Sequence, residues 1–428
     1  MKLRTPRVAI APAGAYVSLA AFGVAAVIAA APGLTVQIAI VLGAAVSAMS
    51  VILARAGRVL NPAWVAVAMI HLIGPIGGIF TQSDTDASVV AVVVLGLSPF
   101  AIAALLVRPE TRRRLLLLTP FVLLLVLAVV SLAWSPSRSY GTAKLFLWIV
   151  TGLLPAAFII VLGGGSRRVA WGLIVAAASA TAVASFAFPD SGYPPTLFNV
   201  NPILASRAAF LGVLVVLFCP FPIVVKAVTA PLILAGGLLG LSLGPLLGLA
   251  VGVVAGSAEA LRRADQSSRR VALGWASLGL CVGLALLIAV SGLADPLLAG
   301  LFADPNVEAR AGYLRAVAPL FLDAPLFGVG FGGFAATGLH EYPHNMVAEV
   351  AAELGMAGLV LLLAWFAIVL RAASGSPVLV ALVVATATFS LFSGSVGSNS
   401  EFWIFSALAL AMSRIGRDKA GTDLDRRS

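Results

Sequence analysis

Long apolar runs, separated by short polar or charged segments, repeat along almost the whole chain. A helix needs about 20 consecutive apolar residues to cross the hydrocarbon core of a bilayer. The runs fall near 10–31, 34–54, 62–80, 87–107, 115–133, 144–163, 169–188, 208–225, 228–242, 245–258, 271–291, 345–370, 377–393 and 401–415. The pattern therefore predicts an all-α fold, a polytopic integral membrane helical bundle of about 12–14 transmembrane helices.

Two neighbouring runs, 228–242 and 245–258, are short for complete spans. They could instead form a re-entrant pair around Ser242-Leu243-Gly244-Pro245, which leaves the number of spans open. A transmembrane β-barrel would need segments of about ten residues with alternating polarity, and the sequence contains none.

Composition supports a membrane protein. Hydrophobic residues make up 61% of the chain and charged residues only 10%, whereas a soluble domain carries about 25% charged residues. The net charge of +10 could suggest nucleic acid, but the basic residues sit in short clusters between apolar runs. Membrane lipids are therefore expected as partners, and nucleic acid is not.

The distribution of basic residues predicts an orientation. With the N-terminus in the cytoplasm, 22 of the 27 Lys and Arg residues fall in cytoplasmic segments, as the positive-inside rule requires. We therefore expect a single transmembrane domain over 1–415 and a cytoplasmic tail over 416–428. The five exceptions on the outside each need a reason; they are Arg138, Lys144, Arg207, Arg310 and Arg315.

Two outer loops are long, one over 189–207 and the main one over about 292–344. Residues 308–322 of the main loop are predicted to be helical, which gives a short helical cap on the outer face. Pro325 ends this helix before the glycine-rich stretch 327–334. No strand precedes these glycines, so a tight turn folding back on the bundle is favoured over a nucleotide-binding loop.

The polar residues of greatest chemical interest lie where the run 345–370 begins. His344 and Asn345 precede it, and Glu349 and Glu353 are one helical turn apart and share a face. Ionisable groups beside hydrocarbon tend to be paired or functional. The carboxylates could orient His344, or they could accept hydrogen bonds and pair with the outside arginines, so that they pin the loop to the bundle. Pinning is favoured for Glu353.

The string His340-Glu341-Tyr342-Pro343-His344 has the H-E-x-x-H spacing of zinc proteases. That chemistry needs both histidines on one face of a helix, and Pro343 would interrupt such a helix. No acidic residue elsewhere is evident as a third zinc ligand beside the two histidines, so no metal is expected. A zinc protease stays a minor alternative.

Three outside arginines suit an anionic substrate. The guanidinium fork matches phosphate oxygens, so Arg207, Arg310 and Arg315 are candidates for neutralising a diphosphate leaving group. His344 would then take a proton from an attacking hydroxyl. Arg207 has an alternative interpretation as a residue that snorkels at the head of a span.

Three blocks resemble one known family. The stretch 343–358 reads P-H-N-x3-E-x3-E-x-G-x2-G, the stretch 310–316 reads R-x4-R-A, and the stretch 325–332 reads P-L-F-G-V-G-F-G. Together they resemble the signature of the O-antigen ligase and O-antigen polymerase superfamily of bacterial envelope proteins. The resemblance covers about 50 residues, and the rest of the chain matches only as a multi-span helical protein.

The resemblance implies a metal-independent, inverting glycosyltransferase without cofactors, in the inner membrane of a bacterium. Such an enzyme moves a polyprenyl-diphosphate-linked glycan onto a glycan or lipid-linked glycan acceptor at the periplasmic face. It also implies that His344 is the catalytic base. The substrate-binding residues would be Arg207, Arg310, Arg315, Asn345, Glu349 and Glu353.

The chain departs from the family at one point. Many members carry a Ser-Arg-Gly turn whose arginine contacts the diphosphate, whereas this chain has Leu241-Ser242-Leu243-Gly244-Pro245. Either Arg310 or Arg315 substitutes, the donor differs, or the protein is inactive. Ligase and polymerase also stay open, with a slight preference for a polymerase.

A transporter or flippase for lipid-linked or anionic solutes is the second hypothesis. It would need repeated halves and ionisable groups near the middle of the membrane. Here His71 is the sole clear mid-span ionisable group, and the other candidates gather at the outer face. This asymmetry favours chemistry at a membrane surface.

Overall fold

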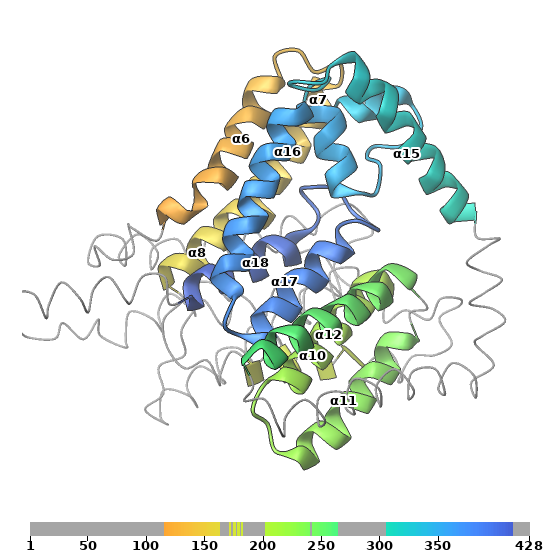
Figure 1. Ribbon diagram of the computed structural model, residues 1–428. Coiled ribbons are helices and arrows are strands. Elements are labelled where there is room, and N and C mark those ends of the chain that lie inside the picture. The colour runs from red at the N-terminus through yellow and green to blue at the C-terminus, as the bar shows by residue number, and fades with distance from the viewer. Residues whose placement is uncertain are drawn as a thin grey trace, which may run out of the picture.

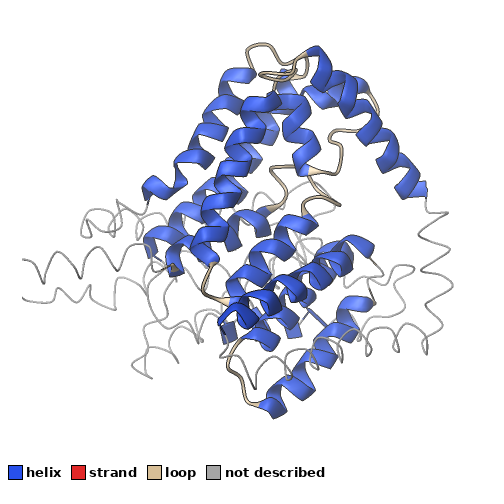
Figure 2. Ribbon diagram, in the orientation of Figure 1, coloured by secondary structure: helices blue, strands red, loops and turns tan. Residues whose placement is uncertain are grey.

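The computed structural model describes residues 115–162, short stretches between 171 and 182, and residues 202–239, 242–263 and 305–413. Within these ranges the regular structure is entirely helical, without any strand (Figure 2). The prediction of an all-α fold is therefore confirmed for the described part of the chain. The first four apolar runs, the run 271–291, His71 and the tail 416–428 lie outside the described residues.

The described helices form two groups in Figure 1. The upper group contains α6 (Thr119–Ser131), α7 (Arg138–Trp148), α15 (Pro305–Asp323) and α16 (Met346–Ala373). The π-helical turn η3 (Ile149–Leu153) joins α7 to α8 (Leu154–Leu162). Below them lie α10 (Pro202–Phe218), α11 (Ile223–Leu238), α12 (Leu243–Arg263), α17 (Pro377–Phe389) and α18 (Ser400–Met412). Short 3-10 turns complete the elements at Leu116–Leu118 and Gly333–Thr337.

Among the described residues, three helical segments are long and apolar enough to cross a membrane, namely Arg138–Ala157, Leu243–Arg263 and Met346–Ala373. Five further apolar helices of 10–17 residues accompany them. One expectation needs correction, because the run predicted to be short at 245–258 belongs to α12, which has 21 residues. The helix predicted over 308–322 is present as α15.

Small residues bring α12 and α17 into close contact. Gly248, Gly252 and Gly256 recur every four residues along α12, so they share one face. A Cβ atom on Gly248 would lie 2.2 Å from the Phe389 ring, and one on Gly252 would lie 3.0 Å from the Ala381 carbonyl oxygen. Close packing over small residues is typical of helices in membranes.

Large aromatic side chains pack where α6, α7 and α16 of the upper group meet α18. Phe121 of α6 stacks on Trp403 of α18 with ring centroids 4.3 Å apart, and Trp148 and Trp365 pack around this pair. All four rings are fully buried. Each such ring buries about 150–250 Å², so this cluster holds α6, α7, α16 and α18 together and provides a rigid base for the loops above it.

Candidate functional site

The helix that follows His344 is broken at Gly355, and the glycine-rich segment fills the break. Gly355 has φ 63° and ψ −157°, which divides α16 into an arm from Met346 and a longer arm from Met356 (Figure 1). The break frees backbone groups that a continuous helix would use internally. Val329 and Gly330 donate their N–H groups to the carbonyls of Ala352 and Glu353, at 2.9 and 3.0 Å.

The opposite side of the break is satisfied in the same way. The N–H groups of Met356 and Ala357 donate to the carbonyl oxygens of Pro325 and Leu326, at 2.8 and 3.1 Å. The expected tight turn folding back on the bundle is therefore confirmed. Its partner is the backbone of α16.

Glycine is required at two of these positions by close approach as well as by positive φ. A Cβ atom on Gly328 would lie 2.2 Å from the carbonyl carbon of Glu353, and one on Gly355 would lie 2.6 Å from that of Leu326. Real Cβ atoms do not approach backbone so closely. The glycines of the turn thus allow two backbone segments to touch, and no nucleotide is needed to explain them.

A buried cluster of three charged side chains lies beside this break. Lys144 of α7 places its Nζ 2.5 Å from Glu349 Oε1 and 2.6 Å from Glu353 Oε2, and all three side chains are about 1% exposed. The ammonium also lies over the Phe331 ring, 4.5 Å from its centroid. The prediction that Glu349 and Glu353 share a face is correct, but their cationic partner is Lys144 rather than an outside arginine.

The two carboxylates also hold loop backbone. Glu353 accepts hydrogen bonds from the N–H groups of Gly332 and Phe334, at 2.8 and 3.4 Å. Glu349 accepts one from Val396, at 2.7 Å, in the loop between α17 and α18. The pinning role predicted for Glu353 is therefore what the structure describes, and Glu349 has a similar role toward a different loop.

His344 has a backbone conformation that is unusual for a residue with a side chain. Its φ is 56°, the only positive value at a non-glycine position among the described residues. Such a conformation costs energy and persists only where the surroundings impose it, often at functional sites. The His344 ring is half-buried, and its Nδ1 is buried without a hydrogen-bond partner in the described part of the chain.

Aromatic rings surround His344. Its ring centroid lies 4.6 Å from those of His340 and Tyr342 and 5.9 Å from that of Tyr313, which comes from α15. The Tyr342 N–H donates to His340 Nδ1 at 3.3 Å, which stabilises the turn before His344. The cap helix and the His loop therefore form one ring cluster: Tyr313, His340, Tyr342 and His344.

The electrostatics of this cluster keep His344 neutral. Burial, and to a smaller extent the nearby His340 and Arg310, together lower the pKa of His344 from its ordinary value to about 4. Burial raises the pKa of Tyr342, an effect opposed by the positive charges of Arg207 and Arg310. Arg310 therefore acts electrostatically on both His344 and Tyr342, and Arg207 acts on Tyr342.

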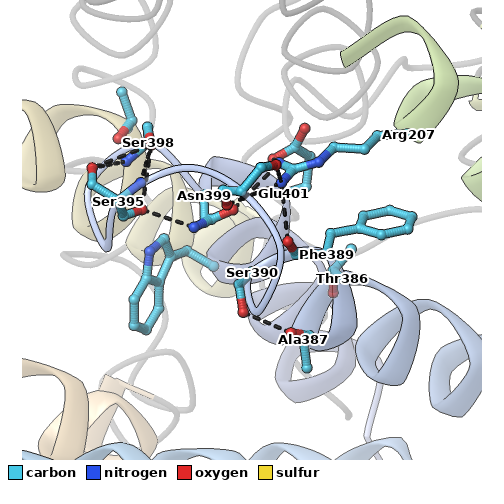
Figure 3. Close-up of polar contacts among 12 residues, drawn as sticks. Arg207, Thr386, Ala387, Phe389, Ser390, Ser395, Ser398, Asn399 and Glu401 are labelled. Atoms are coloured by element: carbon cyan, nitrogen blue, oxygen red, sulfur yellow. Dashed lines mark hydrogen bonds and ion pairs between the residues drawn. The ribbon is translucent and has the colours of Figure 1, made fainter. Parts of the chain in front are cut away.

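The guanidinium of Arg207 lies against the end of α17, the loop that follows it and the start of α18 (Figure 3). It is 2% exposed, and its Nη2 donates to the carbonyl oxygens of Phe389 and Ser393, both at 3.2 Å. Its Nη1 lies 3.3 Å from Asn399 Oδ1 and 3.4 Å from Glu401 Oε2. The snorkelling interpretation is wrong, because this guanidinium is buried and hydrogen-bonded to protein.

The remaining predicted residues are in different environments. Asn345 is the N-cap of α16, and its Oδ1 accepts a hydrogen bond from the Ala348 N–H at 2.9 Å. Arg310 is half-buried and influences His344, as described above. Arg315 is exposed, and its Nε donates to the Ala311 carbonyl within α15 at 3.3 Å.

The H-E-x-x-H string does not form a helix. Residues 340–345 are irregular, and α16 begins only at Met346, in agreement with the effect predicted for Pro343. The described residues include no group of three or more His, Cys, Asp or Glu side chains placed to hold a metal ion. The geometry on which the zinc-protease alternative depends is therefore missing from this segment.

Sequence reasoning missed part of this site. Tyr313 and Tyr342 were not singled out, and Lys144 was noted only as one of five outside basic residues that need a reason. That exception was a usable signal, because a lone lysine in an apolar run implies a buried carboxylate partner. Nothing in the sequence indicated which carboxylates would be its partners.

Comparison with models of known protein families gives no match, and comparison with curated protein sequences gives none either.

Proposed function

We propose that this chain is a membrane glycosyltransferase that uses His344 as the base on an acceptor hydroxyl. The donor would be a polyprenyl-diphosphate-linked glycan, as the resemblance to the O-antigen ligase and polymerase superfamily implies. The observation that carries the proposal is the geometry of His344, which has a positive φ, lies among aromatic rings and has a buried Nδ1 with no hydrogen-bond partner in the described part of the chain.

A base needs a free lone pair and a pKa near the working pH. A pKa of about 4 leaves the imidazole unprotonated at neutral pH but makes it a weak base. A bound diphosphate would change this, because a nearby anion favours the protonated form and raises the pKa of a histidine. Donor binding at Arg310 would therefore strengthen the base at the moment when it is needed.

The roles of the arginines follow from their surroundings. Arg310 is half-buried and interacts electrostatically with both His344 and Tyr342, which suits a residue that binds the oxygens of the departing diphosphate. Arg207 already has four oxygen-bearing partners, so it would support the loop that faces the site. The orientation of the site toward the periplasm and the inner-membrane location belong to the same proposal.

The test is transfer by purified protein in detergent, with a polyprenyl-diphosphate glycan, a glycan acceptor and excess chelator. Chelator-resistant product that disappears in His344→Ala and persists in Arg138→Ala would support the proposal, since Arg138 is exposed and lies outside the ring cluster. A ladder of products would indicate a polymerase, and one adduct a ligase. Normal transfer by His344→Ala would exclude the proposed base.

Absence of transfer by folded wild-type protein with a competent donor would favour the transporter hypothesis. That hypothesis would then be examined by uptake of the same lipid-linked glycan into proteoliposomes. Loss of transfer on addition of chelator would instead favour a metal-dependent reaction.

A further inference from the structure

The buried Lys144 connects segments that are far apart in the sequence. It contacts two carboxylates on the first arm of α16, 205 and 209 positions later in the chain. Desolvation of three charged groups is costly, and a well-packed apolar cluster of similar volume is often equally stable. Stability alone therefore does not explain why an ionic cluster lies here, and its geometric effect must be considered.

Through Glu353 the cluster holds the beginning of the segment that carries His344. Glu353 bonds Lys144 with one carboxylate oxygen, and its two oxygens accept the N–H groups of Gly332 and Phe334. These residues lie at the start of the 3-10 turn Gly333–Thr337, which leads to residues 340–344 of the ring cluster. The ammonium fixes the direction in which this carboxylate points.

Through Glu349 the cluster holds the end of the same segment. Glu349 bonds Lys144 and accepts the Val396 N–H, which ties the first turn of α16 to the loop between α17 and α18. Met346, two residues after His344, donates its N–H to the Ser390 carbonyl oxygen of that loop, at 2.8 Å. At each end of the His344 segment, one of the anchoring carboxylates is therefore a partner of the same ammonium group.

We infer that Lys144 is a positioning residue for His344, which it acts on through Glu353 at one end of the 335–345 segment and through Glu349 at the other. A residue with φ 56° returns to ordinary backbone angles when its surroundings loosen. Without the ammonium the segment would relax, and the His344 ring would lose its burial. The inference rests on the proposed function only where catalysis is measured, since the conformational effect is independent of it.

Histidine modification tests the conformational effect directly. The chain contains three histidines, and cleavage after Glu341 places His340 and His344 on separate peptides. Diethyl pyrocarbonate reacts with neutral imidazole, so the ratio of His344 modification rates at pH 7.5 and pH 5.5 reports its pKa. The pKa of about 4 predicts a ratio near one in the wild type. A relaxed histidine with a pKa of about 6.5 would give roughly a tenfold ratio.

The variants separate positioning from folding. Lys144→Met leaves two buried carboxylates without a cation and could fail to fold. Lys144→Met combined with Glu349→Gln restores the formal charge balance of the cluster but not the bridge from α7 to α16. Arg138→Met is the matched control, because it removes an exposed cation from the same helix.

We expect the double variant to fold and to show a modification ratio of roughly ten. On heating, its buried Cys219 thiol should become reactive at a temperature no lower than in Lys144→Met. Arg138→Met should keep the wild-type ratio. A ratio near one in the folded double variant would overturn the inference, and so would a tenfold ratio in the wild type.

Kinetics provide the second measurement. A displaced catalytic group should lower kcat by about a hundredfold while KM for the donor changes little. A raised donor KM with unchanged kcat would assign Lys144 to substrate binding and contradict positioning. If no form of the protein transfers glycan, the proposed function fails, but the modification ratios still decide whether Lys144 holds His344 in place.

Discussion

The break in α16 predicts a large cost for a single methyl group at Gly355. In Gly355→Ala the added Cβ would lie 2.6–2.7 Å from the backbone of Leu326 and Gly328. The residue would also have to keep φ 63° with ψ −157°, a combination that is essentially confined to glycine. The variant must therefore either strain the break or expel the segment that fills it.

The magnitude follows from what the break holds together. The strained backbone costs about 1–3 kcal/mol if it is kept. If the segment is expelled, four hydrogen bonds between it and α16 are lost, at about 1 kcal/mol each. The first route therefore costs about 1–3 kcal/mol and the second about 4 kcal/mol. Gly312→Ala is the matched control, because Gly312 is helical in α15 and has nothing within 4 Å of an added Cβ.

Thermal exposure of a thiol can measure this difference. Cys219 is buried and 3% exposed, so it reacts with a thiol-specific dye only after unfolding. Removing the other cysteine with Cys281→Ser makes Cys219 the single reporter. In that background Gly355→Ala should unfold at a clearly lower temperature. Gly312→Ala should be unchanged or slightly more stable, because alanine favours a helix interior by up to about 1 kcal/mol.

Equal unfolding temperatures for Gly355→Ala and the parent would refute this reasoning, because the methyl group would then have been accommodated without loss. A comparable destabilisation by Gly312→Ala would also refute it. That result would show a general sensitivity to Gly→Ala changes and no specific requirement at the break.

Three further predictions concern the site. Arg310→Lys should lower donor use at least tenfold if the contact with phosphate is bidentate, whereas Arg315→Lys should have little effect because Arg315 is exposed; equal losses in transfer rate would contradict this distinction. Arg207→Lys should destabilise the protein, because a lysine cannot reach the Phe389 and Ser393 carbonyls and Glu401 together. The thiol-dye assay should then show a lower unfolding temperature. Loss of donor affinity at unchanged stability would restore a substrate-binding role for Arg207. Without donor, the rate of His344 modification should fall as the pH is lowered, with a midpoint near pH 4, because the neutral imidazole persists above its lowered pKa and is lost only below it. A midpoint near pH 6.5 would show that the ring is not buried.

The sequence by itself determined the class of elements and several local features. Apolar runs predict helices because a chain in hydrocarbon must satisfy its own backbone groups. Pro343 predicts the irregular stretch before α16, and the spacing of Glu349 and Glu353 places them on one helix face. These features depend on neighbours within a few positions, so local physical rules are sufficient for them.

Only the tertiary structure decided which groups pair across the chain. Lys144 could have faced any outer carboxylate, and Arg207 could have faced water, lipid or substrate. The fold places Lys144 of α7 between Glu349 and Glu353 of α16, and the end of α17 with the loop after it surrounds the Arg207 guanidinium. Such choices depend on how helices approach one another, and contacts separated by about two hundred residues leave no periodic trace in the sequence.

The break at Gly355 combines both kinds of information. Glycine at this position signals that a side chain is not tolerated, but the sequence does not say what excludes it. The structure supplies the reason, since the backbone of the glycine-rich segment lies where a side chain would be and satisfies the groups that the break releases. The conformation of His344 is of the same kind, because it is imposed by anchors that come from three distant segments.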